Sequence, residues 1–258
     1  MLNIYPIPAF ADNYIWLLAL DNKVWVVDPG ESSPLISHIE QHGLELQAIL
    51  LTHQHLDHWS GVPDILKRWP VPVCGPAAMP AAIQPLITQT LHEGDQIWVA
   101  DQPFQVMATP GHTAEHIVYF CDTSPAPLLF VGDTLFAAGC GRAFYSATDL
   151  FNSIQRLQRL PDNTIIYPSH EYTLSNLAFA MTVEPDNQAL SERLRHCQQT
   201  RAAGLPTLPT TLGLERLTNP FLRLTNTSLQ KNVRTASKSS QNCDLGIFCA
   251  LRNWKNEH

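Results

Sequence analysis

The sequence predicts an α/β domain followed by a small helical domain. The chain has 258 residues, of which 45% are hydrophobic and 15% charged, which is enough for one large domain and a smaller partner. Short β-rich runs alternate with helical ones through the first two-thirds. After about His170 the patterns are helical and contain no strong strand. We therefore expect a first domain over residues 1–170 and a second over 171–258.

The first elements have recognisable end signals. Asn13–Leu20 and Lys23–Val27 are apolar runs joined by a two-residue polar turn, which predicts a β-hairpin. A helix is expected next, with Ser33 as N-cap, Pro34 at its first position and Gly43 at its end. These signals predict a strand–turn–strand–helix start to the first domain.

The remaining elements follow from the same kinds of pattern. Asp28-Pro29-Gly30 ends the second hairpin strand. Apolar residues at helical spacing predict a helix over residues 148–160, and the polar segment 225–242 predicts a loop or weak element. Further strands are expected at 47–52, 71–74, 96–99, 104–109, 117–121, 128–131 and 164–167, and further helices at 60–69, 173–183, 187–203 and 245–255.

Composition excludes several classes of partner. The net charge of -7 argues against nucleic-acid binding, although local basic residues can still bind a small anion. The apolar run 14–20 is too short to span a bilayer, and the N-terminus lacks a secretory pattern. The six cysteines form no Cys-x-x-Cys pair and are expected to be mostly buried thiols in a reducing compartment. We expect a cytoplasmic, monomeric protein that binds neither nucleic acid nor membrane.

Histidines are concentrated in one short window. Of the 11 histidines in the chain, three fall within residues 53–58, together with Asp57. Imidazole and carboxylate groups suit borderline divalent metals such as zinc. The window follows an apolar strand, and its residues are too closely spaced to share one face of a regular helix or strand. A loop leaving the sheet edge can turn several of them toward one point, which predicts a metal site.

Three further ligand candidates follow predicted strands. His112, Asp133 and His170 each come just after an expected strand end, the edge at which α/β sheets build their sites. Seven ligands are too many for one tetrahedral ion but suit two ions about 3.5–4 Å apart that share a carboxylate. We expect the first ion on His53, His55 and His112, the second on Asp57, His58 and His170, and Asp133 between them. The other six histidines (38, 42, 92, 116, 196 and 258) are expected to be packed or surface residues.

The same residues carry a family resemblance. His-x-His-x-Asp-His at 53–58 resembles the signature of the metallo-β-lactamase superfamily, and within it the chain resembles the glyoxalase II (hydroxyacylglutathione hydrolase) family. The narrower resemblance extends over nearly the whole chain. Its motifs are Asp12-Asn13-Tyr14, Val27-Asp28-Pro29-Gly30, Thr109-Pro110-Gly111-His112-Thr113, Gly132-Asp133-Thr134-Leu135-Phe136, Gly139-Cys140-Gly141-Arg142, His170-Glu171-Tyr172-Thr173, Asn219-Pro220-Phe221-Leu222-Arg223 and Leu251-Arg252-Asn253-Trp254-Lys255.

The resemblance implies a fold, a reaction and a set of substrate contacts. The implied fold is a four-layer αβ/βα sandwich with a C-terminal helical domain. The implied reaction is hydrolysis of S-D-lactoylglutathione to D-lactate and glutathione, a step in methylglyoxal detoxification. The resemblance also supports the seven ligands named above and two metal ions, zinc being expected and iron or manganese also suiting such a site. The implied glutathione contacts are Arg142, Tyr172, Arg252 and Lys255, to which we add Phe144.

Several positions depart from the family pattern. Arg142 is followed by Ala143-Phe144-Tyr145-Ser146, where the family often has an apolar residue, Phe, Glu and Gly. Glu115 stands where a glycine is common, and the chain ends in Asn256-Glu257-His258 rather than with a phenylalanine. These departures leave the ligand set intact and bear on substrate affinity.

The hypothesis for the chemistry is attack on the thioester carbonyl by a hydroxide that bridges the two metal ions, with Asp57 and Asp133 orienting it. Cys140 with a histidine base is a rival nucleophile. On the same scaffold, a glutathione persulfide dioxygenase with one iron, a lactonase or a nuclease is an alternative. A non-enzymatic binding module built on an inactive site is a further alternative, although no ligand is missing from the set.

Overall fold

The computed structural model describes residues 2–122, 125–238 and 243–258. The chain divides into two compact units. The first consists of Met1–Thr109 with Glu115–Gly132, and the second of Pro110–Ala114 with Asp133–His258. The short segment Pro110–Ala114 belongs to the second unit although the chain on both sides of it belongs to the first.

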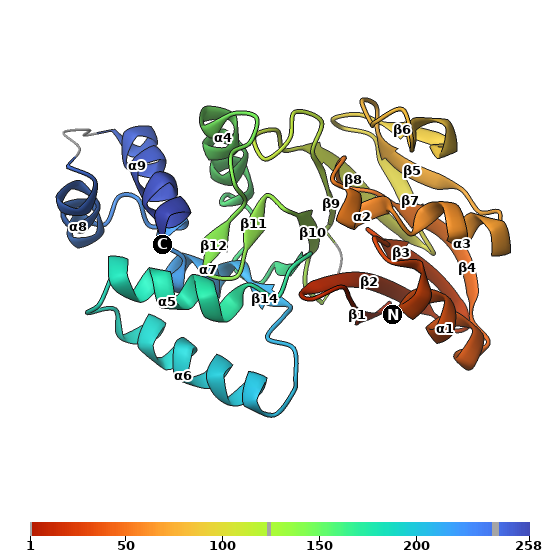
Figure 1. Cartoon of the computed structure of the whole chain (residues 1–258), viewed down its shortest axis with the longest axis horizontal. Coiled ribbons are helices and arrows are strands. Elements are labelled where there is room, and N and C mark those ends of the chain that lie inside the picture. The colour runs from red at the N-terminus through yellow and green to blue at the C-terminus, as the bar shows by residue number, and fades with distance from the viewer. Residues whose placement is uncertain (1, 123–124, 239–242) are drawn as a thin grey trace. The chain divides into compact units, whose positions relative to one another are not determined.

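The first unit contains a mixed sheet of strands β1 to β6, joined in sequence order (Figure 1). β1 to β3 are antiparallel, and β3 to β6 are parallel. Residues of α1 and α3, including Leu35, Ile39, Val62 and Ile65, pack into the same buried core as the strands. The elements are β1 (Asn3–Ala9), β2 (Asn13–Leu20), β3 (Lys23–Val27), α1 (Ser32–His42), β4 (Glu45–Leu50), α2 (Leu56–Trp59), α3 (Val62–Arg68), β5 (Val73–Pro76) and β6 (Gln89–Leu91).

Strand β1 is at the edge of this sheet and contains two prolines. Pro6 pairs with Trp16 and Pro8 with Tyr14 in the register between β1 and β2. Proline has no N–H to donate, so it is tolerated where that side of the strand has no neighbour. The two prolines therefore fit the edge position of β1.

The first unit also contains four antiparallel strands in the order β10-β9-β8-β7. They are β7 (Gln96–Val99), β8 (Gln102–Ala108), β9 (Ile117–Cys121) and β10 (Leu128–Gly132). The hydroxyl of Tyr119 in β9 donates to the carbonyl of Leu51 at 2.6 Å, and Ile117 N donates to Thr52 O at 3.0 Å. Strand β9 is thereby fixed to the chain that leaves β4.

The second unit is mainly helical. Its helices are α4 (Ala147–Leu157), α5 (Thr173–Val183), α6 (Gln188–Ala202), α7 (Leu212–Thr218), α8 (Thr227–Ser237) and α9 (Asp244–Glu257), drawn from green to blue in Figure 1. A small hairpin is formed by β11 (Leu135–Phe136) and β12 (Gly139–Cys140), and β13 (Ile165–Pro168) pairs with β14 (Thr210–Thr211).

A buried polar network joins the β11–β12 hairpin to the helices. Glu215 of α7 is fully buried and accepts from Ala138 N at 2.8 Å, from Asn219 at 3.0 Å and from Arg193 at 2.5 Å. Asn219 also donates to the carbonyls of Phe136 and Gly139. Because buried polar groups are costly when unpaired, this network fixes the hairpin whose second strand begins the Gly-Cys-Gly-Arg segment.

The predicted α/β class and the first hairpin are confirmed. Two local predictions were wrong. Helix α1 begins at Ser32 with Glu31 as its N-cap, so Ser33 is not the cap. The segment 225–242 is a helix over Thr227–Ser237, capped by the side chain of Asn226 on Leu229 N, while positions 239–242 lie outside the described residues.

Two further expectations concern cysteines and membranes. The six cysteines are free thiols, and Cys74, Cys121, Cys140 and Cys197 are buried, as predicted. Among the described parts of the chain, no helix combines the length and apolar character needed to cross a bilayer.

Candidate metal centre

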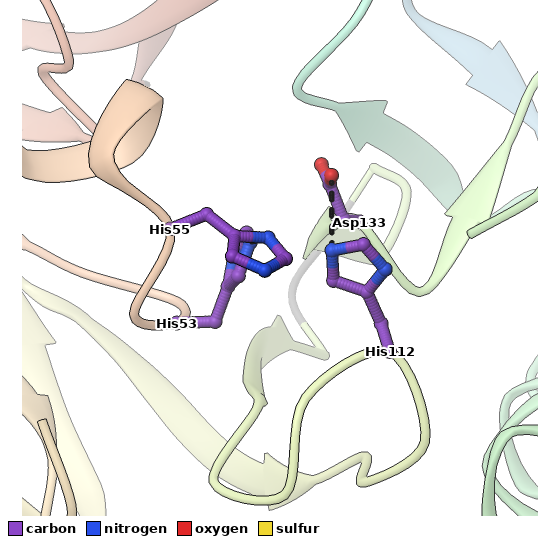
Figure 2. Close-up of side chains that lie close together, drawn as sticks. All are labelled: His53, His55, His112 and Asp133. Carbon is purple, nitrogen blue, oxygen red and sulfur yellow. Dashed lines mark hydrogen bonds and ion pairs between the residues drawn. The ribbon is translucent and has the colours of Figure 1, made fainter. Parts of the chain in front are cut away.

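The candidate ligands of the first unit lie just beyond strand β4. His53 and His55 lie in the loop after the strand, and Asp57 and His58 lie in the four-residue helix α2. His53 and His58 are fully buried, whereas His55 and Asp57 are partly exposed. The loop expected from the close spacing is thus followed by a single helical turn. Figure 2 shows the His55 ring in front of the His53 ring, and the two meet edge to face.

Asp28 fixes this loop from the end of strand β3. Its carboxylate accepts from Thr52 N at 2.8 Å, from the Thr52 hydroxyl at 2.6 Å and from His58 Nδ1 at 2.9 Å. Asp28 is buried and has a φ of 52°, a left-handed conformation that Asp adopts more readily than most residues. A carboxylate on the outer nitrogen of a histidine fixes the orientation and tautomer of the ring, as in many metal sites.

These hydrogen bonds also determine which nitrogen atoms can bind a cation. The single Thr52 hydroxyl proton goes to Asp28, so the contact of 3.0 Å between Thr52 Oγ1 and His53 Nδ1 requires Nδ1 to donate. His53 and His58 are therefore both protonated on Nδ1 when neutral, and both present the lone pair of Nε2. Ligand atoms of Asp28, His53 and His58 lie within 4.8 Å of one another.

The other two candidate ligands of this unit have partners of their own. Asn13 donates through Nδ2 to Asp57 Oδ2 at 3.0 Å and to the Asp57 carbonyl at 3.3 Å. Asn13 is buried at the start of β2, so it holds the Asp57 carboxylate from a rigid strand. His55 Nδ1 lies 3.0 Å from His53 Nε2, and the two rings meet edge to face.

The second unit brings together His112, Asp133 and His170. His112 Nε2 lies 3.3 Å from Asp133 Oδ2, and His170 Nε2 lies 3.4 Å from Asp133 Oδ1, so the two carboxylate oxygens face different histidines. Figure 2 marks the first of these pairs. His112 Nδ1 donates to the Arg142 carbonyl at 2.8 Å, which leaves the Nε2 of a neutral ring as an acceptor facing another acceptor. Two acceptors this close require a proton or a metal ion between them. The imidazole and carboxylate groups suit a metal ion, with Asp133 as a ligand shared by two ions.

Glycines permit the close approach of these segments. A Cβ at Gly141 would lie 2.0 Å from the Asp133 carbonyl oxygen and 3.1 Å from His112 Nδ1. At Gly111, where φ is 136°, a Cβ would lie 2.2 Å from Leu150 N. Any other residue would therefore push His112 away from Asp133 and from helix α4.

Candidate substrate residues lie around the ligands of the second unit. Tyr172 stacks on His170 with 4.7 Å between ring centroids and an angle of 6°. Phe144 meets His112 edge to face at 5.4 Å, while most of its side chain is exposed. Arg142 is exposed. These three side chains lie on or beside the segments that supply His112 and His170.

Arg252 and Lys255 project from helix α9. Arg252 is buried; its Nη1 donates to the Cys140 carbonyl at 2.8 Å, and its guanidinium lies over the Phe221 ring. Lys255 Nζ contacts the Ser175 carbonyl at 3.3 Å and lies over the Phe179 ring. Burial, and then the charge of Arg252, lowers the pKa of Lys255 to about 8. Arg252 thus braces the Gly-Cys-Gly-Arg segment, a role that the sequence did not indicate.

Cys140 does not have the properties of a nucleophile. Burial raises the pKa of its thiol to about 11, and the neighbouring charge of Arg252 opposes this only in part. Its sulfur lies 3.7 Å from Arg252 Nη1. A thiol that stays protonated at neutral pH and has no exposed face is inert.

Comparison with known proteins identifies the family. Residues 10–170 match the model of the metallo-beta-lactamase superfamily, and residues 171–258 match that of the hydroxyacylglutathione hydrolase C-terminus. The chain is 45% identical over 260 residues to the hydroxyacylglutathione hydrolase of Vibrio parahaemolyticus, with 100% of both chains covered. It is 46% identical over 257 residues to that of Hahella chejuensis, with 99% of both covered.

The chain belongs to the hydroxyacylglutathione hydrolase family. This member also resembles solved structures of the superfamily. It matches a metallo-beta-lactamase from Staphylococcus aureus with a TM-score of 0.64 at 22% identity, covering 98% of this chain and 71% of the other. It matches TTHA1623, crystallised in a di-iron-bound form, with a TM-score of 0.61 at 26% identity, covering 84% of this chain and 100% of the other. These likenesses confirm the metallo-β-lactamase fold of this hydroxyacylglutathione hydrolase family member.

Sequence reasoning missed the residues that hold the ligands of this family member. Asp28 was interpreted as part of a strand-ending turn, and Asn13 as the first residue of a hairpin strand. The signal that could have found them is a buried polar side chain beside an apolar strand, since such groups are usually paired. The sequence alone does not say which group each of them pairs with.

Proposed function

We propose that this chain hydrolyses the thioester S-D-lactoylglutathione to D-lactate and glutathione, a step in methylglyoxal detoxification. The observation that carries the proposal is the full-length match to hydroxyacylglutathione hydrolases, including the C-terminal region with Arg252 and Lys255. The presence of all seven candidate ligands supports it. We further propose a monomeric cytoplasmic enzyme. Its domain boundary is proposed between residues 170 and 171, where the two family models meet, rather than at the limits of the compact units.

The fold and its His/Asp clusters support the binding of two divalent metal ions. We propose that the ligands are His53, His55, Asp57, His58, His112, Asp133 and His170. Zinc suits this mixture of imidazoles and carboxylates, and iron is the main competitor because TTHA1623 has a di-iron-bound form. Two such ions would supply hydroxide at neutral pH and polarise the thioester carbonyl.

The residues of the chain have distinct tasks in this scheme. Asp57 and Asp133 would orient the attacking hydroxide, and Asn13 holds the Asp57 carboxylate through two hydrogen bonds. Asp133 already faces His112 and His170 with separate oxygens, an arrangement that suits a ligand shared by two ions. The departing thiolate needs little proton donation, because thiols are much stronger acids than alcohols.

Glutathione binding is assigned to side chains of the second unit. The substrate carries two carboxylates, which Arg and Lys side chains pair with. Arg142 and Lys255 supply positive charge, and Tyr172 and Phe144 supply ring faces beside His170 and His112. Arg252 would contribute to glutathione binding in two ways: by holding the Gly-Cys-Gly-Arg segment in place and by direct contact with the substrate.

The experiment is to follow the loss of thioester absorbance of S-D-lactoylglutathione with and without a chelator. We expect hydrolysis by the protein as purified, loss of activity with the chelator and recovery on adding zinc. Asp133→Ala should lose metal and activity together, by about 100-fold or more in kcat, because a shared ligand is removed. An Asp133→Ala protein with two bound metals and normal turnover would contradict the scheme.

Two other functions give different results in the same preparation. A glutathione persulfide dioxygenase would consume oxygen when given glutathione persulfide. A non-enzymatic binding module would retain glutathione thioesters without cleaving them. The match to hydroxyacylglutathione hydrolases over the full length favours the hydrolase over both.

A further inference from the structure

Residues 115–117, which lead into strand β9, run beside residues 52–54 of the loop that carries His53 and His55. Ile117 N donates to Thr52 O at 3.0 Å. The His116 ring stacks on the His53 ring with 4.8 Å between centroids and an angle of 23°. A Glu115 carboxylate oxygen accepts from Gln54 N at 2.9 Å. The segments 115–117 and 52–54 therefore touch residue by residue.

The middle contact is rigid. His116 is fully buried, and its Nδ1 lies 3.0 Å from the Thr109 hydroxyl. A Cβ at Gly132 would lie 2.6 Å from Thr52 Oγ1 and 2.7 Å from His116 Nε2, so strand β10 closes over both side chains. The histidine interpreted as a packed residue is indeed packed, and it is packed against a candidate ligand.

Glu115 supplies the contact that the family resemblance does not lead one to expect, since a glycine is common at this position. Gln54 is the residue between His53 and His55, and its N–H belongs to the peptide plane that joins it to His53. Fixing that plane restricts the directions in which both histidines leave the backbone. A hydrogen bond from an N–H to a carboxylate is stronger than one to a neutral acceptor.

We propose that Glu115 is a positioning residue for the His53 and His55 ligands, acting through its hydrogen bond to Gln54 N. Glu115 pre-orders the loop in the metal-free chain and thereby strengthens metal binding at the proposed centre, on which this inference rests. Glu115 is not one of the proposed metal ligands and acts only through Gln54.

The test compares two substitutions at this position with a control. Glu115→Gly removes the acceptor and installs the residue common in the family, so the protein is expected to fold. Glu115→Gln keeps an oxygen acceptor and removes the charge. Asp95→Gly is the matched control, because Asp95 accepts from His92 N at 2.8 Å in the turn between β6 and β7.

Two readouts are measured. The first is hydrogen exchange of the Gln54 amide in metal-free protein. We expect slow exchange in the wild type and Glu115→Gln, and exchange faster by about 10-fold or more in Glu115→Gly. The second is the zinc Kd from chelator competition, expected to rise about 10-fold in Glu115→Gly and to stay within about 3-fold in Glu115→Gln and Asp95→Gly.

The outcomes separate this inference from the proposed function. Equal Gln54 exchange in the wild type and Glu115→Gly overturns the inference, whatever the metal content. Equal zinc Kd values in these two proteins also overturn it, while thioester hydrolysis by both leaves the proposed function standing. If Glu115→Gln loses as much zinc affinity as Glu115→Gly, the negative charge of Glu115 rather than its hydrogen bond to Gln54 strengthens zinc binding. The positioning role is then wrong.

Discussion

The carboxylate of Asp28 lies 2.9 Å from His58 Nδ1 and accepts from both the N–H and the hydroxyl of Thr52. One buried side chain at the end of β3 therefore orients His58 directly and His53 through Thr52. The position of the His53 imidazole thus depends on the Thr52 hydroxyl, which in turn is held by the Asp28 carboxylate.

Replacing Asp28 with asparagine tests this dependence. The amide keeps one acceptor oxygen but presents an NH₂ group to donors, so His58 loses its anchor. Because asparagine tolerates a positive φ, the backbone should be preserved. We expect a zinc Kd about 10 to 100-fold higher, measured by chelator competition. Asp21→Asn is the control, since Asp21 has a φ of 54° in an exposed turn; equal affinity in both variants would refute the role.

The low pKa of Lys255 predicts a pH-dependent KM. Burial and the Arg252 charge lower this pKa to about 8, so Lys255 is charged below pH 8 and loses its charge above it. Affinity for the glutathione carboxylates should therefore fall as pH rises through 8, with KM rising roughly 10-fold and kcat changing little. Steady-state kinetics after subtraction of spontaneous hydrolysis provide the measurement. Lys255→Arg should keep KM flat, and an unchanged profile in Lys255→Gln would show that this lysine does not bind substrate.

Removing the Cys140 thiol should leave turnover intact. Arg252 is held by the Cys140 carbonyl at 2.8 Å, and that contact survives substitution of the side chain. We expect kcat of Cys140→Ala to stay within about 2-fold of the wild type, because the buried thiol is protonated and takes no part in attack. A fall of several hundred-fold with normal metal content would restore the rival nucleophile.

Glu215 should matter for stability. It is fully buried and bonded to Arg193, Thr210, Asn219 and Ala138 N. Glu215→Ala leaves the buried Arg193 without its carboxylate, so the free energy of unfolding should fall by about 3–5 kcal/mol. Denaturant titration measures this. Glu192→Ala, at an exposed position of α6, is the control and should change stability by less than about 0.5 kcal/mol.

Elements with strong periodicity or clear end signals could be predicted from the sequence. The hairpin β2–β3, strand β9 and helix α5 have the predicted bounds. Strand β1 was missed because Pro6 and Pro8 argue against a strand unless its edge position is known. The segment of helix α8 predicts only a loop or weak element, because its polar composition obscures the two buried residues Leu229 and Val233, four apart on one face.

The candidate ligands were predictable because their chemistry is concentrated in unusual residues at strand ends. The residues that hydrogen-bond to the ligands could not be predicted, because such a role depends on which side chains the fold brings together. Asn13 and Asp28 are ordinary polar residues until the fold places them against Asp57 and His58. The contact of Glu115 with Gln54 spans 61 positions and has no local signature. The assignment of Arg252 and Lys255 to glutathione stays a prediction.

The two prolines of strand β1 have a consequence for the protein in concentrated solution. An edge strand with unpaired main-chain N–H and C=O groups can hydrogen-bond to a strand of a second molecule, which leads to fibrils and precipitates. Pro6 and Pro8 remove alternate main-chain donors from the outermost strand of the first sheet. Replacing both with valine would give a more regular ribbon, and a chain more inclined to aggregate.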